Sequence, residues 1–184
     1  MELCQTGWVL GNPKQDVKSQ TGQGKQMITP HSFFVESAEL KDIPTIAEFQ
    51  LCHASEVENL KLDAMRVQEG VARVIEDHTL GFYLVARERS PHGSNQTIGT
   101  LLITKEWSDW RAKFVWWIQS AFVHPDYRRK GVFTALYRHV ESEAHAQNAA
   151  GIRLYVERGN HNAKAIYQRL GLSSEHYEMF EKLF

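Results

Sequence analysis

The sequence predicts one α/β domain of the α+β type, with a mixed, mostly antiparallel central sheet of about six strands flanked by helices. Its first half contains short apolar runs separated by a Pro- and Gly-containing turn, which is typical of an antiparallel hairpin. Its second half alternates strand, helix and strand, the order of a parallel βαβ unit. Segment 114–123 is nearly all apolar, as expected of a strand buried on both faces. Trp116 and Trp117 within it must therefore point to opposite faces of the sheet.

Local patterns justify each element in order. Asp42 is a candidate N-cap residue and Pro44 suits the first helical turn. The turn 90–95 joins two strand-like runs. Val132 and Leu136 begin an apolar stripe of helical spacing. In chain order the predicted elements are a strand at 33–40, helices at 44–53 and 59–76, hairpin strands at 82–87 and 97–104, a strand at 114–123, a helix at 132–147, a buried strand at 152–157, a helix at 161–170 and a closing strand at 176–183.

The first 30 residues differ from the rest of the 184-residue chain. They are rich in Gln, Gly, Lys and Ser, and their apolar residues show no sustained period. We expect residues 1–30 to be a poorly ordered extension and residues 31–184 to form the single domain.

Composition restricts the classes of function. A formal net charge of −1 argues against a nucleic-acid-binding protein, and no apolar run approaches the roughly 20 residues that span a membrane. The N-terminus lacks the pattern of a signal peptide. Cys4 and Cys52 lie far apart, so they indicate neither a metal site nor a disulfide framework, and Cys52 suits a helix face in a reducing compartment. The scattered histidines show no metal-ligand spacing. We expect a cytoplasmic protein without a metal; its oligomeric state stays open, with a homodimer as one option.

The run VHPDYRRKGVF at 123–133 carries the clearest functional signal. It leads from a strand through a basic turn with Gly131 into a helix. The unpaired N–H groups of a first helical turn and the helix dipole favour an anion, and glycine lets the backbone approach it closely. Neither the P-loop nor the dinucleotide-binding spacing is present. By itself this pattern is also compatible with a solvated basic turn.

A second segment, GNHNAKAIYQRLGL at 159–172, supplies the specificity that the turn lacks. The two segments together resemble the GNAT superfamily of N-acetyltransferases. The family signature Arg/Gln-x-x-Gly-x-Gly/Ala matches Arg128 and Gly131, while Phe133 departs from its small sixth residue. The signature Asn-x-x-Ala-x-x-x-Tyr-x-x-x-Gly followed by an apolar residue is matched by Asn160, Ala163, Tyr167, Gly171 and Leu172. The resemblance covers 32–184.

The resemblance implies an enzyme that transfers an acetyl group from acetyl-CoA to a primary amine by direct attack in a ternary complex. Asn160 is implied to reach acetyl-CoA where two parallel strands separate. Tyr167 is implied to be the general acid, because a phenol with a pKa near 10 keeps its proton at neutral pH. The implied backbone and loop contacts to the pantetheine arm and the pyrophosphate are Ala121, Phe122, Val123, Arg128, Arg129, Lys130, Gly131, Val132, Phe133 and Thr134.

The general base stays open. Some family members carry a glutamate where this chain has Trp117. The candidates are Glu56 and Glu58, in the region that roofs the acceptor site in this family, and Glu106 and Asp109, in the segment that enters the central strand. Each of these acids is more typical of a solvated surface charge, and a water chain is a further alternative.

The segment KEWSDWR at 105–111 is the other unusual stretch. Trp107, Asp109 and Trp110 could form a wall that receives a cationic amine, or a loop that covers the sheet edge. The acids near the expected site (Glu56, Glu58, Glu106 and Asp109) outnumber the cations, which, together with the two tryptophans, favours a small cationic amine as the acceptor. Two other functions stay open: a non-catalytic acyl-CoA-binding or regulatory domain, which has no need of Tyr167 as an acid, and a peptide or protein N-acetyltransferase.

Overall fold

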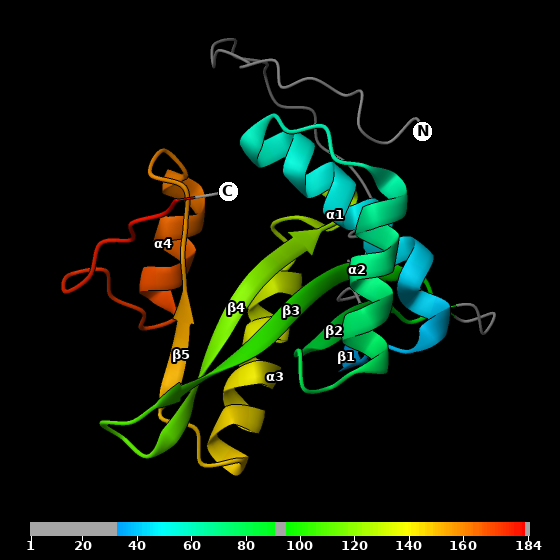
Figure 1. The fold of residues 1–184 in the computed structure, drawn as a ribbon. Helices are drawn as coiled ribbons and strands as arrows, with labels where there is room; N and C mark the ends of the chain where they lie inside the picture. Colours follow the sequence, from blue (N-terminus) through cyan, green and yellow to red (C-terminus); the bar gives the residue numbers. More distant parts are fainter. Residues whose placement is uncertain (1–32, 91–94, 183–184) are drawn as a thin grey trace, which may run out of the picture.

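A computed structural model describes residues 33–90 and 95–182, built on a five-stranded sheet in the order β1-β2-β3-β4-β5 (Figure 1). The first four strands pair antiparallel and β4 pairs parallel with β5, which confirms the expected mixed, mostly antiparallel sheet. The elements are β1 (Phe33–Ser37), η1 (Leu40–Asp42), α1 (Ile43–Glu58), α2 (Ala64–Glu76), β2 (Phe82–Glu88), β3 (Thr97–Ser108), β4 (Lys113–Val123), η2 (Pro125–Tyr127), α3 (Val132–Ala146), β5 (Gly151–Leu154) and α4 (His161–Arg169).

Helices cover both faces of the sheet. On one face α3 buries an apolar stripe against the centre of the sheet, where Trp116 is 1% exposed. On the other face α1 and α2 pack on β2 and β3 around Ile46 and Val71. Trp116 lies in the α3 core, whereas Trp117 is only partly buried, so the two tryptophans occupy opposite faces as predicted. Cys52 is buried on α1, in agreement with its expected role as a helix-face hydrophobe.

Four expectations about individual elements are wrong. Residues 176–182 form no strand, so the described sheet has five strands and not about six. β5 ends at Leu154 and is a half-exposed edge strand, not a buried one. β3 continues through the exposed residues 105–107 to Ser108, because the end of the β3–β4 hairpin faces solvent and tolerates charged side chains there. The Asp42 side chain does not cap α1; it accepts hydrogen bonds from Arg87 and from the Glu39 N–H.

Two helices also end or begin at residues other than those predicted. α1 continues to Glu58, and α2 begins only at Ala64, where the Asp63 side chain accepts a hydrogen bond from the Arg66 N–H. The predicted extension 1–30 and turn residues 91–94 lie outside the described residues, and so does the last residue of the predicted closing strand. Over the described ranges, no helix is long and apolar enough to cross a membrane.

Candidate active site

The two parallel strands separate part-way along β4. Their pairing begins at Val115 with Gly151 and ends at Ile118 with Leu154. β4 then continues to Val123 with β3 on one side and, among the described residues, no strand on the other. The backbone expected to bind a pantetheine arm (Ala121, Phe122, Val123) therefore lies on an open strand edge, which is the geometry that added-strand pairing requires.

The loop after β4 contains two residues with a left-handed backbone conformation. Arg129 has φ 62° and Gly131 has φ 86°, and α3 begins at Val132. A Cβ built on Gly131 would meet no heavy atom within 4 Å, so the backbone there borders open space. The N–H groups of the first turn of α3 (Val132, Phe133, Thr134) have no acceptor within the helix. This combination can receive an anion.

The Arg128 side chain is held by other groups of the protein. Its Nε donates to the Val123 carbonyl oxygen at 2.9 Å, and its Nη2 lies 2.6 Å from an oxygen of Glu56. Lys130 instead lies over the ring of Tyr127, with its Nζ 5.1 Å from the ring centroid. The backbone of this loop is thus better placed than the Arg128 side chain to hold an anionic ligand.

Tyr167 lies on α4, and Asn160 is the N-cap residue of that helix. The Tyr167 ring packs on Phe133 with the ring centroids 5.6 Å apart. This contact explains why a large aromatic residue stands at position 133, where the family signature has a small one. Burial raises the pKa of the Tyr167 phenol, so it stays protonated at neutral pH. Within the described part of the chain its hydroxyl has no hydrogen-bond partner. Asn160 caps α4, with its Oδ1 accepting from the Ala163 N–H at 3.0 Å, and its amide nitrogen stays available to a ligand.

Two of the acids proposed as base or amine-binding groups, Glu56 and Glu106, are ion-paired. Glu56 contacts Arg128, as described above. Glu106 accepts from Trp117 Nε1 at 2.5 Å through one oxygen and from Arg153 Nη1 at 3.0 Å through the other. An arginine therefore neutralises the negative charge at each of these two positions, so the acids do not form the free negative surface that the sequence suggested. Glu106 nevertheless lies against Trp117, the residue at the position of the family glutamate.

The structure does not bring Trp107, Asp109 and Trp110 to the opening between β4 and β5. They lie at the end of the β3–β4 hairpin, where Trp110 is 87% exposed and the Trp107 ring packs edge-on against Phe114. Five residue steps along β4, from Lys113 to Ile118, separate this tip from the point where the strands part, about 17 Å along an extended strand.

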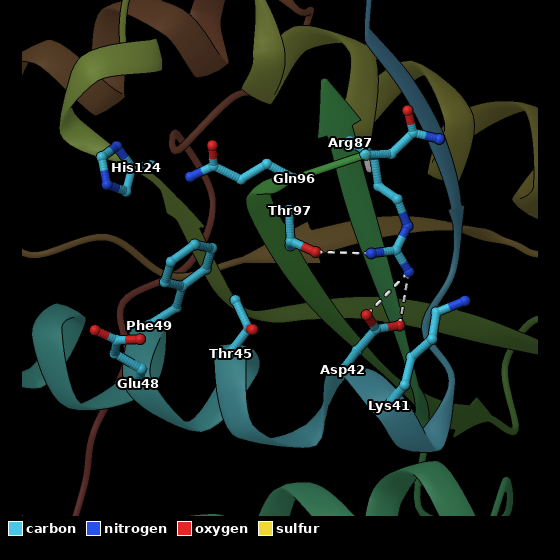
Figure 2. A pocket seen from close by; sticks show the side chains of 10 residues that line it. Lys41, Asp42, Thr45, Glu48, Phe49, Arg87, Gln96, Thr97 and His124 are labelled. Carbon is cyan, nitrogen blue, oxygen red and sulfur yellow. Dashed lines mark hydrogen bonds and ion pairs between the residues drawn. The ribbon is translucent and has the colours of Figure 1, made fainter. Parts of the chain in front are cut away.

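A cavity of about 750 Å³ lies elsewhere, beside the N-terminal half of α1 (Figure 2). Its wall contains the buried pair Asp42 and Arg87: Arg87 Nη2 donates to both carboxylate oxygens at 2.9 and 2.8 Å, and its Nη1 donates to Thr97 at 2.8 Å. The lining residues are Lys41, Asp42, Thr45, Glu48, Phe49, Arg87, Asn95, Gln96, Thr97 and His124. They include no residue of the glycine loop (residues 128–131) or of α4, so we assign this cavity no part in the chemistry. Among residues 33–90 and 95–182, no group of three or more His, Cys, Asp or Glu side chains could hold a metal ion.

Comparison with known proteins identifies the family and the fold. The model of the acetyltransferase (GNAT) family matches residues 46–172. The chain belongs to the GNAT family of acetyltransferases. It is thus an acetyltransferase, and the matched residues include the opening between β4 and β5, the glycine loop and Tyr167.

Solved structures place this GNAT protein among acetyltransferases. It is similar to a possible acetyltransferase from Clostridium difficile 630, with 35% sequence identity, a TM-score of 0.74 and coverage of 83% of this chain and 97% of the other. A ribosomal-protein-alanine N-acetyltransferase from Brucella melitensis biovar Abortus 2308 shares the fold at 14% identity, with a TM-score of 0.64 and coverage of 83% and 100%. An aminoglycoside acetyltransferase, meta-AAC0020, from an uncultured soil metagenomic sample shares it at 15% identity, with a TM-score of 0.64 and coverage of 83% and 97%. No curated protein matches the chain.

Sequence reasoning missed three side chains near the opening of this acetyltransferase. Arg153 pairs with Glu106, and the Tyr155 hydroxyl donates to the Gln119 carbonyl oxygen at 3.2 Å, across the gap between the strands. Gln50 of α1 donates to the Ser120 hydroxyl at 2.9 Å. The alternation of Arg153 with apolar neighbours in IRLYV was a usable signal, because it indicates a strand with one polar face.

Proposed function

We propose that this protein is an acetyl-CoA-dependent N-acetyltransferase acting on a primary amine of a small molecule. The observation that carries the proposal is the open edge of β4 leading directly into a left-handed Gly131 and the N-terminus of α3. The open edge suits the amide groups of a pantetheine arm, and the loop suits a pyrophosphate. Empty space around the Gly131 Cα supports the fit, because a side chain there would occupy the place of the anion.

The chemistry follows from the same groups. The amine nitrogen attacks the thioester carbonyl carbon, a C–N bond forms, and the C–S bond breaks to leave a thiolate. Tyr167 gives its phenolic proton to that thiolate, and burial favours this role because it keeps the phenol neutral. The attacking amine loses one proton. Since both nearby carboxylates are held by arginines, we assign that proton to solvent water.

A screen of amines tests this function. The purified protein is incubated with acetyl-CoA and a panel of small amines, polyamines, amino acids and peptides, with free thiol as the readout and the mass of the acetylated product as confirmation. We expect amine-dependent thiol release for small primary amines. Peptide acetylation with no small-molecule turnover would assign the enzyme to protein substrates, and CoA binding without any acetyl transfer would favour a regulatory acyl-CoA-binding domain.

A further inference from the structure

Arg153 is an arginine with one edge fixed and one edge free. Its guanidinium carbon lies 5.7 Å from the ring centroid of Trp117 and 5.7 Å from that of Tyr177. Its Nη1 donates to Glu106 at 3.0 Å. Over the described residues, Nε and Nη2 have no hydrogen-bond partner, and the side chain is 33% exposed. The Nε–Nη2 edge is the planar fork that matches a carboxylate with two parallel hydrogen bonds.

The neighbours of Arg153 hold this fork in place. Two aromatic rings restrict the guanidinium plane through cation–π contacts. Glu106 is itself oriented by Trp117, whose Nε1 donates to its second oxygen at 2.5 Å. Glu106 is therefore fixed through both oxygens, and it holds the Nη1 edge of Arg153 while the Nε–Nη2 edge keeps its donors. The arrangement is a preorganised anion receptor, since the side chain loses little further freedom when a ligand binds.

The receptor lies beside the opening between β4 and β5. Arg153 is paired with Trp117, one position before the last pair of β4 and β5, so it is about 3–7 Å along the strand from the opening. Trp117 and Ser120 share a face, because their partners on β3 are Thr104 and Leu102, two residues apart. This is the face on which α1 reaches Ser120 through Gln50. An amine that enters the opening from this face would extend its substituents over Arg153.

We propose that Arg153 binds a carboxylate of the acceptor, so that the acceptor is a small amine that also carries a carboxylate, as in an amino acid. This inference rests on the proposed function and specifies its substrate class. The ammonium group of such an acceptor would lie near Glu106, and its carboxylate would accept hydrogen bonds from Nε and Nη2 of Arg153. Arg153 is thus a specificity-determining residue.

The test compares L-amino acids with the matching L-amino acid amides, which differ only in the carboxylate. A hydrogen bond to a charged group contributes about 1.5–3 kcal/mol, so we expect kcat/KM to favour the acids about 10- to 150-fold. Arg153→Gln should bring this ratio close to one, mainly through KM, and Arg153→Lys should give an intermediate ratio because it keeps the charge but not the fork. Arg138→Gln is the matched control, since Arg138 also pairs with a glutamate, Glu141 at 2.5 Å, but lies on α3.

A binding readout accompanies the kinetics. With coenzyme A present, N-acetyl amino acids should raise the melting temperature more than N-acetyl amino acid amides, and Arg153→Gln should remove that difference. Equal use of acids and amides by the unmodified enzyme, or an unchanged preference in Arg153→Gln, would overturn the inference and leave the proposed function standing. Failure to acetylate any amine, with or without a carboxylate, would overturn both.

Discussion

Gly131 and Gly171 form a natural pair for testing the anion site. Gly131 has φ +86° and Gly171 has φ +87°, and an added Cβ would meet no atom within 4 Å at either position. Replacement by alanine therefore causes no clash and costs only the left-handed backbone, about 1–2 kcal/mol at each site. For a chain of this size, each variant should melt about 2–8 °C below the unmodified protein.

Coenzyme A should separate the two variants. At 100 times its Kd a ligand stabilises the native state by about 2.7 kcal/mol, or about 5–11 °C. Loss of one backbone hydrogen bond to a charged oxygen weakens binding by about 10- to 150-fold. At the same concentration a 100-fold weaker ligand adds only about 0.4 kcal/mol, roughly 1 °C. We expect Gly171→Ala to keep the full ligand-induced shift and Gly131→Ala to lose nearly all of it.

The assay is thermal unfolding of the three proteins with and without coenzyme A. The differences between variants without ligand measure the shared backbone cost, and the ligand-induced differences measure the anion site alone. Equal ligand-induced shifts in Gly131→Ala and Gly171→Ala would refute the assignment of the pyrophosphate to this loop.

The remaining predictions concern stability and pH. Asp42→Ala removes one carboxylate partner of the buried Arg87, which keeps Glu36 and Thr97, and should cost about 1.5–3 kcal/mol in urea unfolding, the contribution of a hydrogen bond to a charged group. Lys41→Ala removes only the exposed pair with Glu39 and should change urea unfolding little. Gly81→Ala should abolish folding or lower its yield sharply, because the new Cβ would lie 2.3 Å from the Ile103 carbonyl oxygen; equal expression and melting would contradict this. Because burial raises the pKa of Tyr167, the pH–rate profile should show no alkaline fall from this group below pH 10.0; a fall in kcat between pH 8 and 9 that disappears in Tyr167→Phe would contradict the raised pKa.

The stretches that could be predicted from sequence are those in which neighbouring residues determine structure. The apolar run of β4, the turn at Gly131 and the helical stripe from Val132 are local patterns, and the structure confirms each. The closing strand at 176–183 was predicted from alternation around Tyr177 and Met179, but alternation cannot supply a pairing partner. Residues 176–182 pair with no strand in the described structure.

The interactions that define the acceptor side join residues far apart in sequence. Glu106 meets Arg153 across 47 residues, and Arg128 meets Glu56 across 72. No local pattern indicates such pairs, so the sequence suggested free acids where the structure has ion pairs. Lys105 is a further example. Its polarity led to a predicted strand that ended at residue 104, but β3 continues through Lys105, whose ammonium lies 5.0 Å from the ring centroid of Trp116.

Amine-dependent thiol release from acetyl-CoA, measured side by side for the unmodified enzyme and Tyr167→Phe, tests the central claim most directly. Phenylalanine keeps the ring packing on Phe133 and removes only the proton donor. We predict clear amine-dependent release by the unmodified enzyme and a turnover about 10²-fold lower in Tyr167→Phe, with the affinity for acetyl-CoA little changed. Equal turnover in the two proteins would contradict the role of Tyr167, and no amine-dependent release by either would contradict acetyl transfer to an amine.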